Sequence, residues 1–414
     1  MAVPRVKARH RAQPKRLAWP DAAKGVSIVG VVLLHISLVV PDADLQQWLV
    51  TTNKVLSPLR MPLFFLVSGY FSTKVLRQSF GQLMLKRVWF FLVPYFMWIP
   101  IQHYASSWHY HLSGAGPLIT LPAVMDSMFR GHNMGWFLYA LALFNIALWL
   151  LKFLPRWLAM VLSVVIPLVC LPYYEHFHMV SKALMYLPLF LVGALFKDAV
   201  TTFVYEVRRA YRSPRGAIYV AISVALYVGG LRLRAWWDSL EGLQTADWPL
   251  WNAETLVDVE LLVLVKSLQQ YITMPFAIMC ALVLAATGPL SWGFQVIGRN
   301  TLPIYLSHPV ALSLAYGLVR LRMGVDIVDG GAWPWENPNF WIIYCVVICG
   351  LVGFLVWGLN KIPVLGWFVQ PPHLWILEDH VDGVAERRAE RRHARQKARQ
   401  AAKTAETLAA RRQG

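Results

Sequence analysis

Ten long apolar runs dominate this sequence and constrain its fold more than any other feature. They lie at residues 22–40, 56–73, 88–105, 135–152, 156–172, 183–197, 216–232, 260–287, 301–319 and 339–359. A helix needs about 20 apolar residues to cross the hydrocarbon core of a bilayer, and backbone in lipid must satisfy its own hydrogen bonds. The sequence therefore predicts an all-α, polytopic transmembrane helix bundle of about ten spans. The polar start of the 260–287 run, with Lys266, Gln269 and Gln270, predicts an amphipathic or partly re-entrant beginning.

Composition supports a membrane protein and explains the high net charge. Hydrophobic residues make up 57% of the 414 residues and charged residues only 15%, against about 25% charged residues in typical soluble domains. Most of the net charge of +17 lies at the two ends, with six Lys/Arg in residues 1–16 and ten in residues 384–414. Basic ends beside membrane spans favour retention on the cytoplasmic side and contact with anionic lipid headgroups, so we expect no nucleic-acid partner.

The distribution of charge also predicts the topology. An even number of spans puts both termini on one side, and the positive-inside rule makes that side cytoplasmic. The loops that would then be cytoplasmic are basic, whereas the opposite connections at 233–260 and 320–338 are acidic. We expect a basic cytoplasmic arm at residues 1–20, a transmembrane domain at 21–377 and a basic cytoplasmic tail at 378–414, all at the inner (plasma) membrane.

Two polar residues interrupt the first apolar run. Lys24 and His35 are eleven positions apart, which on an α-helix places them within about 20° of one face and roughly 16 Å apart along the axis. The sequence thus predicts a cation at the membrane edge and an imidazole well inside. An ionisable residue at that depth indicates function, and a histidine bonded to a neighbouring helix for packing alone is the alternative.

Further polar residues lie in or near the second and third runs. Arg60 precedes the helix that contains Ser68, at a depth comparable to that of His35 in the neighbouring span. It can snorkel to the headgroups, or it can hold His35 or a substrate oxygen. Lys86 and Arg87 begin the third run. Topology alone accounts for such a pair, and the same pair also suits the phosphates of a cytoplasmic cofactor.

Polar and aromatic residues later in the sequence can likewise have either a structural or a functional role. Trp136 opens the fourth run, where an interfacial aromatic is the simplest explanation. Arg299 opens the ninth run and His308 lies one to two turns into it, where a packing histidine bonded to a carbonyl is an alternative to a functional one. Histidines in the outer loops match no zinc pattern, so we expect no metal site. These outer-loop residues are His103, His109, His111, His132, His176 and His178.

Taken in order, these motifs resemble acyltransferase family 3. The resemblance rests on Lys24 with His35, on the MPLFFLVSGY run at 61–70, on Lys86-Arg87, on the Trp-Phe-Leu at 136–138 and on Gly-Arg-Asn-Thr at 298–301 leading to His308. It implies an integral-membrane enzyme that acylates, usually acetylates, hydroxyls of extracytoplasmic glycans and envelope lipids from a cytoplasmic acyl-coenzyme A. Many members have arginine where this chain has Lys24, and lysine also pairs with phosphate, though without a bidentate fork.

The resemblance also implies roles for individual residues. Lys24, Lys86 and Arg87 would hold the phosphates of acetyl-CoA or another acyl-CoA, and His35 would be the general base or a transient acyl carrier. The other residues assigned to the donor side are Arg299, Ser68 and Trp136. Arg60 and His308 would complete the catalytic group, and Arg60, His308 or a backbone amide would stabilise the oxyanion. The acceptor would be an envelope glycan or glycolipid.

Two other functions stay open on the sequence alone. A flippase or exporter of a glycan or lipid would use His35 and Arg60 to line its path. A scaffold would use the basic tail to recruit a partner.

Overall fold

The computed structural model describes residues 17–387, apart from 58–59, 132, 174–177, 243 and 248–254, together with residues 390 and 400. Most of the predicted basic arm and tail, and the outer-loop histidines His132 and His176, lie outside the described residues. The principal helices are α1 (Ala18–Val39), α2 (Gln47–Leu56), α3 (Met61–Tyr70), α4 (Phe80–Leu83), α5 (Trp89–Leu112), α6 (Leu121–Arg130), α7 (Trp136–Leu151), α8 (Arg156–Val169), α9 (His178–Leu184), α10 (Leu187–Leu195), α11 (Lys197–Arg208), α12 (Pro214–Asp238), α13 (Asp258–Leu284), α14 (Pro289–Arg299), α15 (Thr301–Val310), α16 (Leu318–Met323) and α17 (Pro338–Leu359).

Short elements complete the described chain. They are the 3-10 turns η1 (Ala43–Leu45), η3 (Thr73–Arg77), η5 (Leu171–Tyr173) and η7 (Leu365–Phe368), the π-helical turns η4 (Met84–Val88) and η6 (Ala311–Gly317), and the strands β1 (Ala246–Asp247) and β2 (Thr255–Leu256). The two strands form an antiparallel ribbon in the connection between α12 and α13. The all-α helical bundle predicted from the sequence is confirmed.

All ten predicted apolar segments are helical, but they differ in length. Within the described residues, seven helical stretches are long and apolar enough to cross a membrane. Two further segments, α7 and α8, have 16 and 14 residues, and a helical stretch ending in α10 forms with α11 a pair bent by 79°. The run from residue 260, for which the sequence predicts an amphipathic or partly re-entrant beginning, belongs to one continuous helix, α13.

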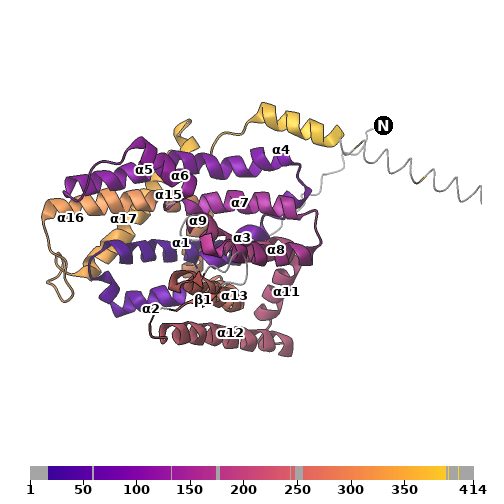
Figure 1. The fold of residues 1–414 in the computed structure, drawn as a ribbon, viewed down its shortest axis with the longest axis horizontal. Helices are drawn as coiled ribbons and strands as arrows, with labels where there is room; N and C mark the ends of the chain where they lie inside the picture. The colour runs from indigo at the N-terminus through magenta and orange to yellow at the C-terminus, as the bar shows by residue number, and fades with distance from the viewer. Residues whose placement is uncertain are drawn as a thin grey trace, which may run out of the picture.

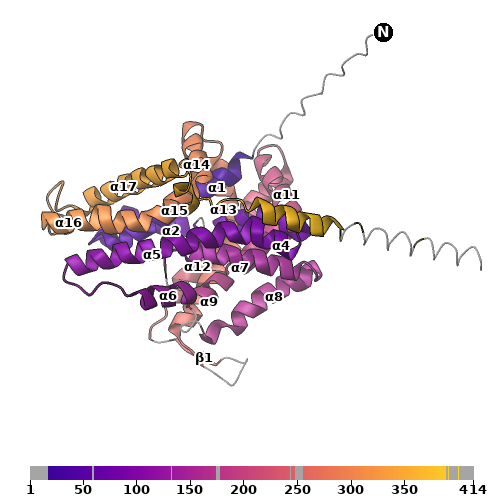
Figure 2. The same ribbon diagram turned by 90° about the horizontal axis from the view of Figure 1, so that it is seen from above.

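The helices run side by side, with α1 in contact with many of the others. Figure 1 shows α1, α5, α7, α12 and α17 extending in a common direction, and Figure 2 shows the same bundle from above. Glycine allows the closest crossings. A Cβ on Gly298 would lie 1.8 Å from the Asp21 carbonyl oxygen, and a Cβ on Gly69 would lie 1.9 Å from that of Phe190. The backbones of α1 and α14, and of α3 and α10, therefore touch directly.

An aromatic cluster holds α3, α7 and the turn before α10 together. The ring of Phe65 lies within 6.0 Å of the ring centroids of Trp136, Phe137, Phe144 and Tyr186. Such aromatic pairs each contribute about 0.5–1.5 kcal/mol beyond the area that they bury. This cluster fixes one wall of the cavities described below.

Candidate active site

Two histidines from helices far apart in the sequence meet in the bundle. His35 projects from α1 and His308 from α15, and their Nδ1 and Nε2 atoms are 2.7 Å apart. The ring centroids are 4.9 Å apart and the ring planes differ by 5°. With so short a nitrogen to nitrogen distance the rings must meet edge to edge, in nearly one plane, as in a linear hydrogen bond. We call His35 and His308 the histidine pair.

The hydrogen bonds of His308 define which nitrogens carry protons in the neutral pair. His308 is fully buried, and its Nδ1 lies 2.7 Å from the Tyr305 carbonyl oxygen. Because a carbonyl can only accept, His308 Nδ1 carries the proton and its Nε2 is an acceptor. His35 Nδ1 must then donate to His308 Nε2, which leaves a lone pair on His35 Nε2. The arrangement orients His35 as a base, as a carboxylate orients the histidine of a catalytic triad.

A cavity of about 250 Å³ lies along α1 on the side of Lys24. We call it the Lys24 chamber; its polar lining includes Lys24, Ser68, Arg87 and Asn145. Lys24 Nζ lies 5.0 Å from the centroid of the Phe71 ring, and Arg87 donates to the Phe71 carbonyl oxygen at 3.1 Å. Lys24 and Arg87 therefore line one cavity, and its remaining walls are mostly apolar.

Asn145 is a residue of this chamber that the sequence analysis missed. Its side chain is fully buried on α7, and its Nδ2 donates to the Leu141 carbonyl oxygen at 2.7 Å. Its Oδ1 accepts no hydrogen bond from the described part of the chain. A buried amide oxygen without a donor is unfavourable by about 1–3 kcal/mol. An amide N–H of a bound molecule would satisfy it.

A smaller cavity, of about 150 Å³, surrounds His35. We call it the His35 chamber; it is lined by His35, Arg60, Trp136, Lys182 and neighbouring apolar residues. It shares Val31, Met61 and Tyr305 with the Lys24 chamber. The two chambers therefore adjoin, and Lys24 and His35 face cavities that meet within the bundle.

Arg60 lines the His35 chamber, and its side chain packs against α1 at Gly30, which has no side chain. Its Cγ would lie 2.7 Å from a Cβ on Gly30, so a larger residue at position 30 would displace it. Arg60 Nη1 donates to Asn53 Oδ1 at 3.2 Å. A third cavity, of about 510 Å³, begins here. We call it the Lys266 groove; it shares Leu34, Ser57, Arg60 and Gln270 with the His35 chamber.

The remaining predicted site residues lie apart from the Lys24 chamber. Trp136 lines the His35 chamber instead. Arg299 Nε donates to the buried Asp21 carboxylate at 3.1 Å, an ion pair that joins α14 to α1. Lys86 follows Met84 and Leu85 in the π-helical turn η4 and points away from Arg87, its neighbour in the sequence. The sequence alone does not predict which of these side chains line the Lys24 chamber.

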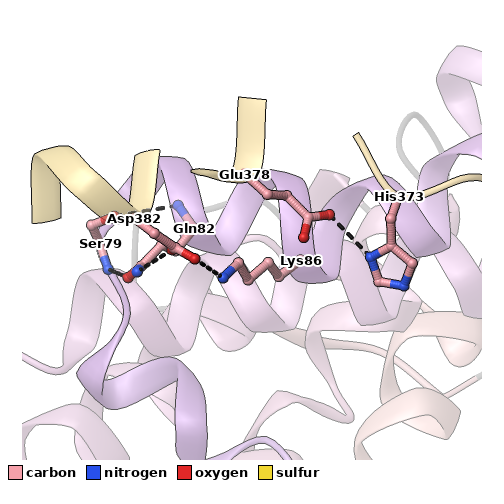
Figure 3. A network of polar contacts seen from close by, with 6 residues as sticks. All are labelled: Ser79, Gln82, Lys86, His373, Glu378 and Asp382. Carbon is pink, nitrogen blue, oxygen red and sulfur yellow. Dashed lines mark hydrogen bonds and ion pairs between the residues drawn. The ribbon is translucent and has the colours of Figure 1, made fainter. Parts of the chain in front are cut away.

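Lys86 binds the segment that follows α17. Figure 3 shows Asp382, in a helical stretch at 375–387, reaching Lys86 Nζ at 2.6 Å and accepting from Gln82 Nε2 at 2.7 Å. Nearby, His373 Nδ1 lies 3.1 Å from Glu378. The first turns of the predicted tail therefore pack on the transmembrane domain across Lys86.

Replacing Asp382 should loosen this stretch. We expect Asp382→Asn to speed cleavage after Glu378 by endoproteinase Glu-C about two- to five-fold, because a half-exposed ion pair contributes little more than about 1 kcal/mol. Hydrogen bonds from Lys86 and Gln82 hold the pKa of the Asp382 carboxyl below its usual value. Stabilisation is then complete above the usual carboxyl pKa of about 4 and is lost as pH falls through the lowered value. Asp379→Asn, at an exposed carboxylate of the same stretch, should leave the rate unchanged; equal acceleration by both would contradict this role.

Among the described residues, no group of three or more His, Cys, Asp or Glu side chains is arranged to hold a metal ion. The chemistry at this site that the described chain can supply is that of a base, several cations and a buried amide.

Comparison with known protein families identifies the family of this chain. The sequence profile of an acyltransferase family, described as the acyltransferase domain and numbered family 3, matches residues 17–357. No curated protein and no solved structure matches the chain significantly. The matched region includes the histidine pair and both chambers, and it spans most of the chain. The protein therefore belongs to acyltransferase family 3.

Proposed function

We propose that the protein is a membrane O-acyltransferase that moves an acyl group, most simply acetyl, from cytoplasmic acyl-CoA to a hydroxyl of an extracytoplasmic glycan or glycolipid. One observation supports the proposal: His35, which His308 orients, lines a chamber that adjoins the Lys24 chamber through shared residues. A donor can enter from one side of His35 and an acceptor from the other.

The Lys24 chamber suits the donor. Lys24 and Arg87 would bind phosphates of coenzyme A at its mouth, on the side that the positive-inside rule predicts to be cytoplasmic. The pantetheine arm would extend along the apolar walls toward His35, and its amide N–H groups match the unsatisfied Oδ1 of Asn145. Lys86, held by Asp382, would act at this mouth only when the tail segment moves, and Arg299 would support the site by positioning α14.

The chemistry uses the lone pair on His35 Nε2. As the acceptor oxygen attacks the thioester carbonyl, its proton passes to His35 Nε2, and Arg60 stabilises the oxyanion. His308 Nε2 accepts from His35 Nδ1 throughout and so supports the imidazolium. When the tetrahedral intermediate collapses, the C–S bond breaks and the proton passes from His35 to the departing sulfur. The products are an ester and free coenzyme A.

Transfer of label tests the function. Membrane vesicles containing the full-length protein would receive [1-¹⁴C]acetyl-CoA on the cytoplasmic side, and label would be followed into envelope glycans and lipids. An acyltransferase gives alkali-labile label in the acceptor and an acetyl-sized mass increase. An exporter of glycan or lipid would move its substrate across the vesicle membrane without labelling it, and that outcome would refute the proposal.

Lys24 should affect the donor rather than the chemical step. We expect Lys24→Gln to raise KM for acetyl-CoA about 10- to 100-fold with little change in kcat, since a hydrogen bond to a charged group contributes about 1.5–3 kcal/mol. Lys24→Arg should keep most of the affinity. Lys74→Gln, at an exposed lysine of the nearby turn η3, is the control. An unchanged KM in Lys24→Gln would exclude Lys24 from donor binding.

A further inference from the structure

Cations gather on the side of His35 that faces away from the Lys24 chamber. Lys182 on α9 lines the His35 chamber, and Lys266 on α13 lines the adjoining groove. The groove also contains Arg234, but this residue is paired with Asp238 at 2.8 Å. Lys182 and Lys266 form no ion pair with any carboxylate in the described part of the chain. The groove is also lined by Lys54 and by two carboxylates, Asp44 and Asp238. Cations outnumber carboxylates in the linings of the two cavities, so the positive charge there is incompletely neutralised.

The position of Lys182 is unfavourable without a ligand. Its ammonium lies 5.0 Å from the centroid of the Trp136 ring, half-buried in the chamber wall. Arg60 lines the same chamber, and Lys266 lines the groove that adjoins it. A half-buried ammonium beside other cations is destabilising unless an anion compensates it. A cation–π contact contributes only about 0.5–2 kcal/mol.

Two ordinary explanations fail for Lys182. The positive-inside rule predicts lysines at the Lys24 end of the bundle, and Lys182 lies at the other end, beside His35. Snorkelling places an ammonium among lipid headgroups, whereas the half-buried Lys182 lines a cavity of the bundle. A ligand with negative charge explains this position, and Lys266, which is exposed in the adjoining groove, is accessible to the same ligand.

We propose that Lys182 and Lys266 form an anion-binding subsite for the acceptor, which is a glycoconjugate carrying a phosphate or carboxylate group close to the hydroxyl that is acylated. The inference rests on the proposed acyl transfer and specifies its substrate class. Lys182 shares the His35 chamber with the base, so the anionic group would lie near the reacting hydroxyl. Gln270 lines both the chamber and the groove and can bind the sugar between them.

Direct binding tests the subsite without any acyl transfer. Purified full-length protein would be dialysed against [³²P]phosphate or [¹⁴C]glucuronate, with coenzyme A at saturation to fill the donor side. We expect Lys182→Gln with Lys266→Gln to weaken binding of one of the two anions about 10- to 100-fold, and Lys182→Arg to retain it. The anion that binds distinguishes phosphate from carboxylate.

A matched lysine provides the control. Lys361 also lies over a tryptophan ring, at 4.0 Å from the Trp357 centroid, but lines none of the three cavities. Lys361→Gln should leave anion binding unchanged. Equal binding by wild type and the double variant would overturn the proposal.

The labelled product gives a second, independent readout. The product formed from [1-¹⁴C]acetyl-CoA should be retained by an anion exchanger, and Lys182→Gln should raise KM for this acceptor while leaving KM for acetyl-CoA unchanged. Label confined to neutral products would contradict the anionic acceptor. If no label is transferred at all, the acyltransferase proposal fails, and the dialysis experiment still decides whether the anion subsite exists.

Discussion

His35→Ala should lower the rate of acyl transfer about 10²- to 10⁴-fold, the range expected for loss of a general base. The structure gives the reason: His35 Nδ1 is engaged by His308, so the lone pair on Nε2 is left to take the proton of the acceptor hydroxyl in the proposed reaction. KM for acetyl-CoA should change little, since the proposed phosphate site is at the Lys24 chamber. The measurement is the initial rate of label transfer at saturating donor.

The matched control is a histidine that lies outside the cavities. His103 on α5 is bonded to Ser127 Oγ at 2.7 Å and lines none of the three cavities. His103→Ala should therefore leave the rate close to wild type. Imidazole added to His35→Ala should restore part of the activity by entering the space left by the side chain. Full activity in a folded His35→Ala protein would show that another group is the base.

Hydropathy and helical periodicity predicted the helical bundle and half of the geometry of the candidate site, namely the placement of Lys24 and His35 on one helix face. The ten apolar segments follow from the need to satisfy backbone hydrogen bonds in lipid, a constraint that acts within each segment. The placement of Lys24 and His35 along one face of α1 is likewise local, because both belong to one helix. Both side chains face the adjoining chambers, as that spacing predicts.

The other half depends on packing between helices, which no local pattern encodes. Nothing around His308 indicates that its partner is His35, because the pairing requires α15 to cross α1 at one particular depth. Asn145 and Lys182 each lie beside apolar residues and resemble ordinary ends or interior positions of spans. Their chemistry becomes visible only when the cavities are known.

Two predicted features proved to have structural roles as well. Gly69 and Gly298, from the motifs that carry the family resemblance, let helices cross with their backbones in contact. The adjacent residues Lys86 and Arg87 in the turn η4 have different partners, Asp382 for Lys86 and the Phe71 carbonyl oxygen for Arg87, because neighbouring residues of a helix do not face the same way. The prediction from the sequence had assigned both residues to the phosphates of a cofactor.

His308 should affect kcat through its Nε2, which accepts the hydrogen bond from His35 Nδ1. We expect His308→Leu to reduce kcat about 10²- to 10³-fold, because His35 Nδ1–H then has no partner and the imidazole loses its orientation and the support of its charged form. His308→Gln can place an amide oxygen near the position of Nε2, so it should recover a substantial part of the rate. The comparison requires kcat and KM for each variant at saturating acetyl-CoA.

The contrast between these variants separates positioning from packing. Leucine and glutamine fill similar volumes, so a merely structural role would give similar rates for both, and that result would contradict the hydrogen-bonded pair. A positioning role predicts that glutamine exceeds leucine in kcat while both bind the donor normally, since His308 lies outside the lining of the Lys24 chamber. Imidazole rescue distinguishes the two histidines further: it should act on His35→Ala and fail on His308→Leu, where the base is still present but is no longer held.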